Sequence, residues 1–326
     1  MSRHFILPID DKYEIKVNYF IESVANHIFN TSDFFYIHQT DRAFYFQLCK
    51  KNSEIVLGTI HFTEIASDLF KSPAKGTFGG FVIQENIEFN IYEQFIITIN
   101  NYLWRIGAKK VEVIMPPMCH NTSLFSLTYN IMIRLGYAVT NHELNYDLVV
   151  DDRCFSAKIN HGNRKRLNKC LREGLTAKEL DYSVYDQAYS IILENRIRRG
   201  FIFSMNYEQI LKMVYTFPEK IKFFGVFNKD VIVCSSICVV INPFILYVYA
   251  WGDIDNMQNY SPITLLANYI YEYAQKKAFQ LIDLGTSTVL GEPNIGLMQF
   301  KKNLGCQESL KLSFSKDSKI MITENQ

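Results

Sequence analysis

The sequence predicts a mixed α/β fold (α+β, with a mixed sheet) that is built from two tandem copies of one domain. The first evidence is a strand–helix–strand pattern in the second half of the chain, between Ile245 and Leu284. The second is the same order of elements in the first half, between Gly79 and Met115. An apolar meander precedes each copy. We therefore expect parallel strands joined by a crossover helix next to antiparallel ones.

The second copy has the clearer pattern. Ile245–Trp251 is rich in aromatic and β-branched residues, as is typical of a strand, and Gly252-Asp253 ends it. Ser261-Pro262 supplies an N-cap and a first-turn proline for a helix that reaches Lys276-Lys277. A second strand, Phe279–Leu284, ends at Gly285. A helix over Leu297–Leu304 and a strand over Glu308–Phe314 complete the copy.

The first copy repeats this order. Its expected elements are a strand at Gly79–Ile83, a helix over Tyr92–Ile106 that Gly107 ends, a strand at Val111–Met115, a helix over Ser123–Arg134 and a strand at Glu143–Val150. The segments from Gly107 to Gly136 and from Ala278 to Gly305 have nearly the same length. Two copies of one domain are the simplest explanation.

The meanders and the polar linker set the expected domain boundary. Phe44–Leu48 with Ile55–Phe62 precede the first copy, and Ile221–Phe227 with Val231–Val240 precede the second; helical patterns cover 163–173, 185–199 and 207–217. The chain becomes polar over 151–163. We therefore expect an N-terminal domain at 1–155 and a C-terminal domain at 156–326.

Composition indicates an ordinary globular protein. The chain has 326 residues, 34 Lys and Arg against 33 Asp and Glu, and 48% hydrophobic residues, so a strong overall field for a polyanion is not expected. Seven scattered cysteines favour a reducing compartment, with the cytoplasm as the default. Neither a signal peptide nor a membrane span is expected, and the dispersed histidines do not predict a metal site.

Five segments carry a resemblance to a known family: Gly79-Gly80, the helix start at Asn163–Lys169, Ser261–Lys277, Phe279–Gly285, and Leu297–Gly305. Their order is similar to the GNAT acyltransferase fold, and two such domains resemble the FemABX-like peptidyltransferases and their double-GNAT relatives. Phe300-Lys301 in a helix that ends at Gly305 matches that family's pattern of an aromatic residue and a lysine. The resemblance covers most of the chain and implies acyl transfer.

The expected donor site departs from the acyl-CoA pattern. Enzymes of the GNAT fold that use acyl-CoA carry a glycine-rich loop at a helix N-terminus, whose N–H groups meet the pyrophosphate. Here the loop is Asp255–Ser261, which has no glycine. The candidate donor-binding residues are Asn259, Tyr260, Ser261 and, after the next strand, Ser287. Acyl-CoA or acetyl-CoA is one candidate donor, and the resemblance implies aminoacyl-tRNA as another.

The candidate catalytic residues lie at strand and helix ends. Asp283, near the C-terminal end of a predicted parallel strand, could accept a proton from an amine or could cap Gly285–Ser287. Lys301 could hold a phosphate or polarise an acyl carbonyl, or be a solvated helix lysine. Tyr249, Trp251 and Asp253 end the other strand, beside the acceptor cleft that the resemblance implies. Core packing is the alternative for the two aromatic residues.

A basic helix offers an anionic binding surface. Arg164 and Arg166 are the candidate substrate-binding residues of a run that includes Lys165, Lys169 and Arg172, and a solvated helix face is the alternative. Three functions remain open: an acyltransferase that moves an acyl group to an amine by direct attack, an aminoacyl-tRNA-dependent transferase acting on a cell-wall or sugar-nucleotide precursor, and a degenerate binding module.

Overall fold

A computed structural model describes residues 4–22, 27–203, 205–255, 257 and 260–318. The chain forms two compact units: unit 1 is Met1–Glu143 with Leu310–Gln326, and unit 2 is Leu144–Ser309. The expected boundary at 155/156 lies inside unit 2. The reason is strand pairing, because the second part of β8 (Ala138–Val149) pairs with β13 (Leu281–Thr286) of unit 2, and the last strand, β16 (Gln307–Asp317), pairs with β7 (Lys110–Ile114) of unit 1.

Unit 1 is a mostly antiparallel sheet with helices packed on it. Its strands follow the order β1-β2-β3-β4-β5-β7-β16, and β5 pairs with β7 in parallel. Besides β7 and part of β16, its elements are β1 (Phe5–Pro8), β2 (Tyr13–Val17), η1 (Ile28–Asn30), α1 (Ser32–His38), β3 (Ala43–Lys50), β4 (Val56–Ala66), β5 (Leu69–Ser72), β6 (Val82–Ile83), α2 (Phe89–Arg105), η2 (Met118–His120) and α3 (Thr122–Arg134).

Unit 2 repeats this arrangement, with the strand order β8-β13-β12-β11-β10-β9 and a parallel pair β12–β13. Besides β8, β13 and part of β16, its elements are α4 (Phe155–Lys158), α5 (His161–Arg172), β9 (Thr176–Glu179), η3 (Tyr182–Val184), α6 (Tyr185–Arg198), α7 (Tyr207–Thr216), β10 (Ile221–Asn228), β11 (Val231–Asn242), β12 (Ile245–Asp253), α8 (Pro262–Lys276), β14 (Thr288–Val289), β15 (Glu292–Pro293) and α9 (Ile295–Asn303).

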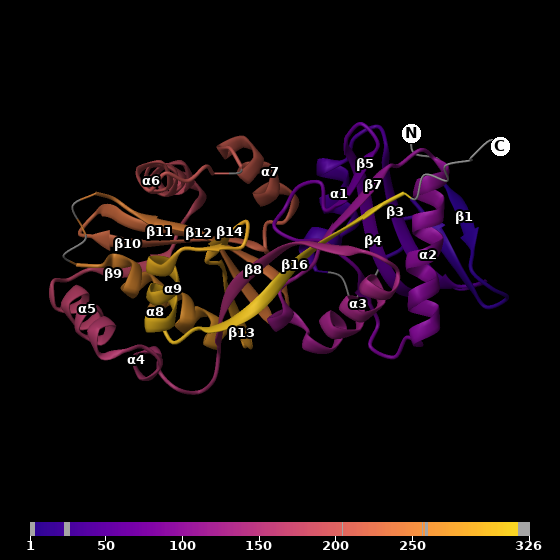
Figure 1. Ribbon diagram of the computed structural model, residues 1–326. Coiled ribbons are helices and arrows are strands. Elements are labelled where there is room, and N and C mark those ends of the chain that lie inside the picture. Colours follow the sequence, from indigo (N-terminus) through magenta and orange to yellow (C-terminus); the bar gives the residue numbers. More distant parts are fainter. Residues whose placement is uncertain (1–3, 23–26, 204, 256, 258–259, 319–326) are drawn as a thin grey trace. The chain divides into compact units, whose positions relative to one another are not determined.

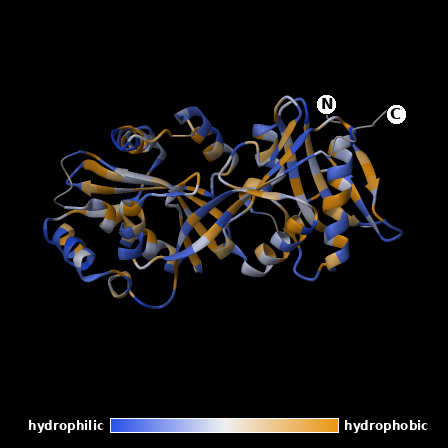
Figure 2. Cartoon of the chain, viewed as in Figure 1, coloured by the Kyte–Doolittle hydropathy of each residue, from blue (hydrophilic) through white to orange (hydrophobic). Residues whose placement is uncertain are grey.

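Helices cover both faces of the unit 2 sheet. In Figure 1, α6 lies on one side of β10–β12 and α8 on the other, and α5 packs against α8. Figure 2 shows apolar strands beside a largely hydrophilic α5. The face under α8 is apolar: Leu266 and Ile270 of α8 pack with Leu246, Val248 and Ile282 of the strands. Burial of these side chains is the main force that holds helix and sheet together.

The two copies have the same local geometry at their helix ends. Gly107 after α2 and Ala278 after α8 both have left-handed backbone angles, with φ of 98° and 60°. Gly136 after α3 and Gly305 after α9 do the same, with φ of 80° and 86°. At Gly305 a Cβ atom would lie 2.6 Å from the carbonyl oxygen of Lys158, so a side chain there would clash. These four positions give two matching anchor points in the two copies.

The predicted elements are present, with shifted ends. The predicted helices over 163–173, 185–199 and 207–217 are α5, α6 and α7, and the turn at Asn242-Pro243 joins β11 to β12. The predicted strand at Gly79–Ile83 shortens to β6, because Gly79 and Gly80 lie in the connection before it. The parallel partner of β7 is β5, which the sequence pattern did not reveal.

Candidate functional site

The candidate site begins where the two parallel strands of unit 2 separate. Their register runs from Ile245 opposite Leu281 to Tyr247 opposite Asp283 and stops there, although β12 continues to Asp253. The register between β11 and β12 passes from Ala250 to Val248, so Tyr249 is the extra residue of a β-bulge. Bulges redirect the backbone and are enriched beside active sites. The divergence therefore begins beside the bulge.

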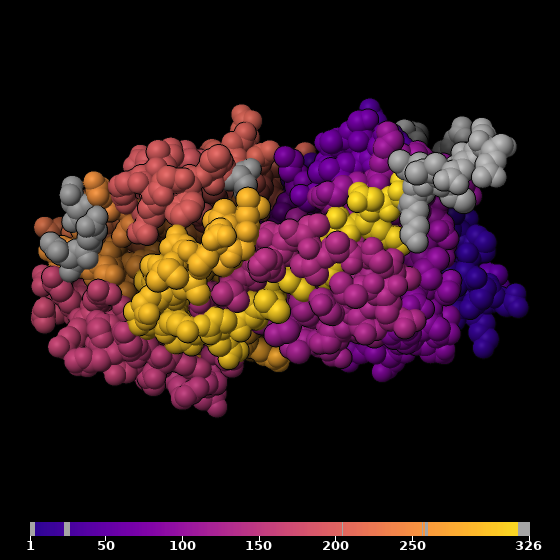
Figure 3. Space-filling model, in the orientation of Figure 1, coloured from indigo at the N-terminus to yellow at the C-terminus, as the bar shows by residue number. Residues whose placement is uncertain are grey.

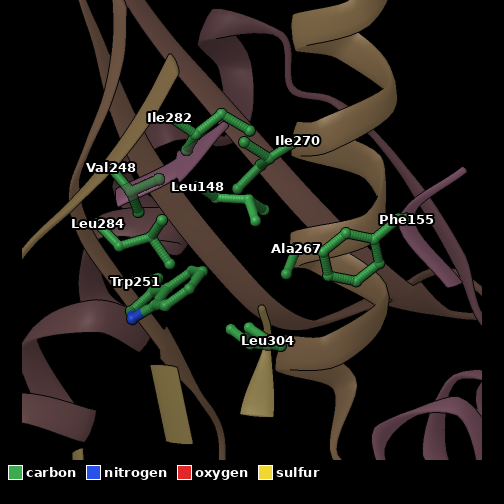
Figure 4. A pocket seen from close by; sticks show the side chains of 9 residues that line it. All are labelled: Leu148, Phe155, Val248, Trp251, Ala267, Ile270, Ile282, Leu284 and Leu304. Atoms are coloured by element: carbon green, nitrogen blue, oxygen red, sulfur yellow. The ribbon is translucent and has the colours of Figure 1, made fainter. Parts of the chain in front are cut away.

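Apolar side chains fill the space under this divergence. A cavity of about 10 Å³, room for about one water molecule, remains between α8 and the strands (Figure 4). Its lining is entirely apolar: Leu148, Phe155, Val248, Trp251, Ala267, Ile270, Ile282, Leu284 and Leu304. The Trp251 ring also meets Phe300 edge-to-face, with centroids 5.9 Å apart. Trp251 is thus a packing residue here, in line with the alternative reading of the sequence.

Lys301 is buried and holds the end of β13. The side chain is 2% exposed, and its Nζ donates to the carbonyl oxygens of Gly285 at 2.8 Å and Thr286 at 2.9 Å. Burial lowers the pKa of Lys301 to about 8, and the nearby Asp283 carboxylate partly opposes that shift. A buried ammonium is costly unless its protons are bonded. The solvated-lysine reading is therefore wrong, and Lys301 instead binds the strand end.

Asp283 lies on the opposite sheet face from Ile282 and Leu284. It is fully buried, and its Oδ1 accepts hydrogen bonds from Asn145 Nδ2 and from the Gly285 N–H, both at 2.8 Å. The capping role that the sequence indicated is present. Asp147 of β8 stands directly opposite Asp283 in the antiparallel register and is also fully buried, with its Oδ2 accepting from Gln307 Nε2 at 2.9 Å.

Asp253 ends β12 in a more open position. Its Oδ1 accepts from Asn195 Nδ2 at 2.6 Å and lies 3.6 Å from Arg198 Nη2. Burial raises the pKa of Asp253, while Arg199 and Arg198 act in the opposite direction. Tyr249 is half-buried and meets the Phe203 ring at 5.7 Å. Asp253 is thus a half-buried carboxyl whose pKa is displaced toward the range of an acid–base group.

The start of α8 has the expected N-cap residue with an unexpected backbone conformation. Ser261 has left-handed angles (φ 54°, ψ 55°), and its side chain makes no capping hydrogen bond in the described region; its Oγ lies 3.5 Å from Thr264 Oγ1. The predicted positions of Ser261 at the N-cap and of Pro262 in the first turn are therefore confirmed, but the capping hydrogen bond expected from a serine is not formed in the described region. The ring of Tyr260 lies under Lys169 Nζ at 4.9 Å. Asn259 lies outside the described residues.

The cations of the basic helix α5 fall into two groups. Arg164 Nη1 donates to the carbonyl oxygens of Ser156 and Ile159, and Arg166 Nη1 donates to Asn163 Oδ1 at 3.1 Å. These guanidinium groups are exposed but partly engaged. Figure 3 shows the α4–α5 segment at the surface. A stripe at helical spacing runs along this helix at Lys165, Lys169 and Arg172, and α5 contains no acidic residue.

Not all candidates meet at the divergence. Tyr249, Asp253 and Asp283 belong to β12 and β13, and Lys301 binds the end of β13. Tyr260 and Ser261 instead directly precede α8, where Lys169 of α5 lies over the Tyr260 ring. Ser287 is 1% exposed, and its N–H donates to the Leu144 carbonyl. Sequence reasoning missed Asn145 and Asp147. Their spacing of two within a predicted strand was the available signal, because it places both side chains on one face.

Two observations concern the described part of the chain as a whole. The helices there are too short or too polar to span a bilayer. Within the same residues, His, Cys, Asp and Glu side chains do not gather in groups of three or more that could hold a metal ion.

Comparison with solved structures identifies the fold. Neither a family model nor a curated protein sequence matches this chain. The structure of FemX is similar over 92% of this chain and 94% of its own, with a TM-score of 0.69 and 11% identity. L-PGS from Bacillus licheniformis is similar over 81% of this chain and 82% of its own, with a TM-score of 0.58 and 12% identity.

A third similar structure is the C-terminal domain of a putative lysylphosphatidylglycerol synthetase from Agrobacterium fabrum. It covers 80% of this chain and 81% of its own, with a TM-score of 0.54 and 12% identity. The chain therefore has a FemABX-like tandem GNAT fold, and the fold expected from the sequence is confirmed.

Proposed function

We propose that this protein is an acyltransferase that moves an aminoacyl group from an aminoacyl-tRNA to an amine by direct attack. The observation that carries the proposal is the divergence of β12 from β13 at Tyr247 and Asp283, next to the bulge at Tyr249. Backbone N–H groups of diverging strands are suited to polarise an ester carbonyl. Attack forms the C–N bond and breaks the ester C–O bond, and the ribose hydroxyl of the tRNA leaves.

The residues of unit 2 take distinct roles in this proposal. Asp253, whose pKa burial raises, accepts one proton from the neutral amine as it attacks and passes that proton to the leaving ribose oxygen. The half-buried Tyr249 borders the acceptor. Lys301 and Asp283 are too buried to meet a substrate, so they keep the end of β13 in position. Holding the reacting groups in line supplies much of the rate acceleration in such a reaction.

An aminoacyl-tRNA donor fits the surface better than acyl-CoA does. The space under the diverging strands is filled, and the loop before α8 lacks the glycines of a pyrophosphate site. The cations Lys165, Lys169 and Arg172 of α5 could instead contact phosphates along an RNA backbone. The resemblance to FemABX-like transferases implies an aminoacyl-tRNA donor and a cell-wall or sugar-nucleotide precursor as acceptor, and we propose both for this chain. The seven cysteines are free, which supports a cytoplasmic location within this proposal.

One observation favours acyl-CoA as a second donor. The N-terminus of α8 begins two residues after Tyr260, whose ring Lys169 covers, so helix N–H groups and a cation lie in one region. A pyrophosphate could bind there. In that case Tyr260 and Ser261 would contact the donor.

The test compares both donors with one set of variants. Binding of total charged tRNA is measured by fluorescence anisotropy at several salt concentrations, and binding of acetyl-CoA, longer acyl-CoAs and free CoA by thermal shift. We expect tight, salt-dependent tRNA binding that K165E/K169E/R172E weakens at least about tenfold, with a reduced salt slope. The matched control reverses three exposed lysines of unit 1, in K12E/K50E/K75E, and should bind tRNA almost as the parent does.

The outcomes separate three functions. Transfer of labelled amino acid from charged tRNA to an amine acceptor, abolished by RNase, supports the proposal. A thermal shift with acyl-CoA and no binding of tRNA would replace it with an acyl-CoA enzyme. A lack of binding in both assays would contradict catalysis and leave a binding module.

A further inference from the structure

The register between β8 and β13 brings two carboxylates face to face. Asp147 and Asp283 are directly opposite each other in an antiparallel pair, which places their side chains on the same face with Cβ atoms about 5 Å apart. Both residues are fully buried. Two like charges in one buried site are unfavourable, so such a pair commonly holds one proton between its members.

The groups around the pair define its charge balance. On β13 and α9, Gly285 and Lys301 adjoin Asp283. Gln307, the first residue of β16, binds Asp147, and its neighbours Cys306 and Glu308 lie nearby. On β12, Tyr247 is the register partner of Asp283. Arg196 of α6 is a nearby positive charge that lowers the pKa of Lys301. The buried charges in this set are therefore two carboxyl groups and one ammonium, with the thiol of Cys306 neutral because burial raises its pKa.

Asp283 is the member better suited to be ionised. Its Oδ1 accepts a backbone N–H and an amide N–H, and the Lys301 ammonium lies within electrostatic range. Each of these interactions favours a carboxylate over a carboxylic acid. Asp147 binds the amide of Gln307, a contact compatible with either form of the group.

We propose that Asp147 and Asp283 share one proton, which resides on Asp147, so that the pair carries a single negative charge that balances the Lys301 ammonium. Asp147 thereby becomes a positioning residue: it acts through Asp283 on Lys301, and Lys301 holds the Gly285 and Thr286 carbonyls at the end of β13. This role in positioning rests on the proposed transferase function. The shared proton itself does not depend on it.

The proton is observed directly by carboxyl ¹³C NMR of protein labelled at its aspartate side chains, followed from pH 4 to pH 9. We expect one aspartate resonance that stays protonated at neutral pH, and its loss in D147N. We also expect it to be lost in D283N, because a single remaining carboxylate beside Lys301 ionises. If all aspartates of the parent protein titrate below about pH 5, the proposal is wrong, and this result requires no variant to fold.

The same titrations decide which of the two aspartates carries the proton. A high-pH titration that persists in D147N and disappears in D283N would put the proton on Asp283 and overturn the assignment. Circular dichroism at each pH checks that both variants remain folded. Asn has the shape of a protonated Asp, so D147N is the substitution that disturbs the packing least.

A kinetic readout tests the positioning role. In the transfer reaction, D147N should leave the position of the basic limb of the pH profile unchanged, since Asn mimics the protonated carboxyl and Asp283 still balances Lys301. The double variant D147N/D283N should move that limb to lower pH by about 1–3 pH units, because Lys301 then has no counter-charge from the pair. A displacement in D147N as large as that in the double variant would mean that Asp147 supplies the counter-charge, and it would overturn the assignment. If no turnover is found at all, the proposed function fails, while the NMR result still decides the shared proton.

Discussion

Units 1 and 2 share one order of elements but differ under their parallel strand pairs. Counted from the left-handed residues Gly136 and Gly305, the position of Lys301 in unit 2 is that of Met132 in unit 1. Met132 is fully buried in an apolar core. A buried methionine is expected in an apolar core. A buried ammonium indicates a role other than stability, because buried charges are seldom favourable for stability.

The carboxylates show the same contrast. Counted from Gly107 and Ala278, Asp283 corresponds to Glu112, which is half-buried, forms an ion pair with Lys110 at 2.8 Å and stands opposite Ser315 of β16. In unit 2 the corresponding register pairs Asp283 with Asp147. At these two positions unit 1 is therefore stabilised by apolar packing and by a surface ion pair. Unit 2 keeps buried charge where its strands diverge, which supports unit 2 as the site of chemistry.

The largest effect should come from moving the charge into unit 1. M132K places an ammonium in the apolar core of unit 1, without the two carbonyl acceptors and the nearby Asp283 that Lys301 has in unit 2. We expect a loss of about 3–5 kcal/mol in the free energy of unfolding, measured by urea denaturation. M132L is the control and should cost less than about 1.5 kcal/mol. A small effect of M132K would show that unit 1 tolerates charge as unit 2 does.

The pH dependence of unit 2 follows from Lys301. Its pKa is about 8 in the folded protein and ordinarily 10.5, so between these values the unfolded chain binds more protons than the folded one. The free energy of unfolding should therefore rise with pH across that window by about 3 kcal/mol from this group. The difference between the parent protein and K301M, measured by denaturation from pH 7 to pH 10.5, isolates the contribution. A constant difference would contradict the burial argument.

Unit 1 should respond at acidic pH instead. His61 is fully buried, with Nε2 2.9 Å from the Phe29 carbonyl oxygen, and burial lowers its pKa from 6.5 to about 4. The unfolded state then binds the proton first as pH falls, so about 3 kcal/mol of stability should be lost between pH 6.5 and pH 4. Replacing His61 in H61Q should remove this part of the acid sensitivity. Equal acid sensitivity in H61Q and the parent protein would show that the burial of His61 does not cause the loss of stability.

The smallest of these effects concerns the helix ends. Leu304 of unit 2 is 1% exposed and lines the apolar cavity, while Leu135, its equivalent in unit 1, is half-buried. Truncation to alanine should cost at least about 2 kcal/mol in L304A and clearly less in L135A. Thermal and urea unfolding of both variants provide the comparison. A larger cost for L135A would mean that the cavity region contributes little to stability.

Much of the fold and part of the site were predictable from local sequence. Periodicity located the main helices and strands of both copies, because apolar side chains at helical or alternating spacing must face a core whatever that core is. The position of Asp283 near a strand end and the Phe300-Lys301 pair in the last helix indicated the region of the site. The exposed basic run of α5 was equally visible.

The remaining features depend on pairing between distant segments. Asp147 and Asp283 face each other because of the register of β8 on β13, which brings together residues more than 130 positions apart. Local pattern also placed Ser261 correctly at the N-cap, but it did not predict the left-handed backbone there or the missing side-chain capping bond. Likewise, Lys301 is indistinguishable from a solvated lysine until its two carbonyl partners are placed. The sequence by itself determined which segments are helices and strands, since these follow from local periodicity; only the tertiary structure decided the charge balance of the site, since burial and electrostatic interactions depend on distances between segments.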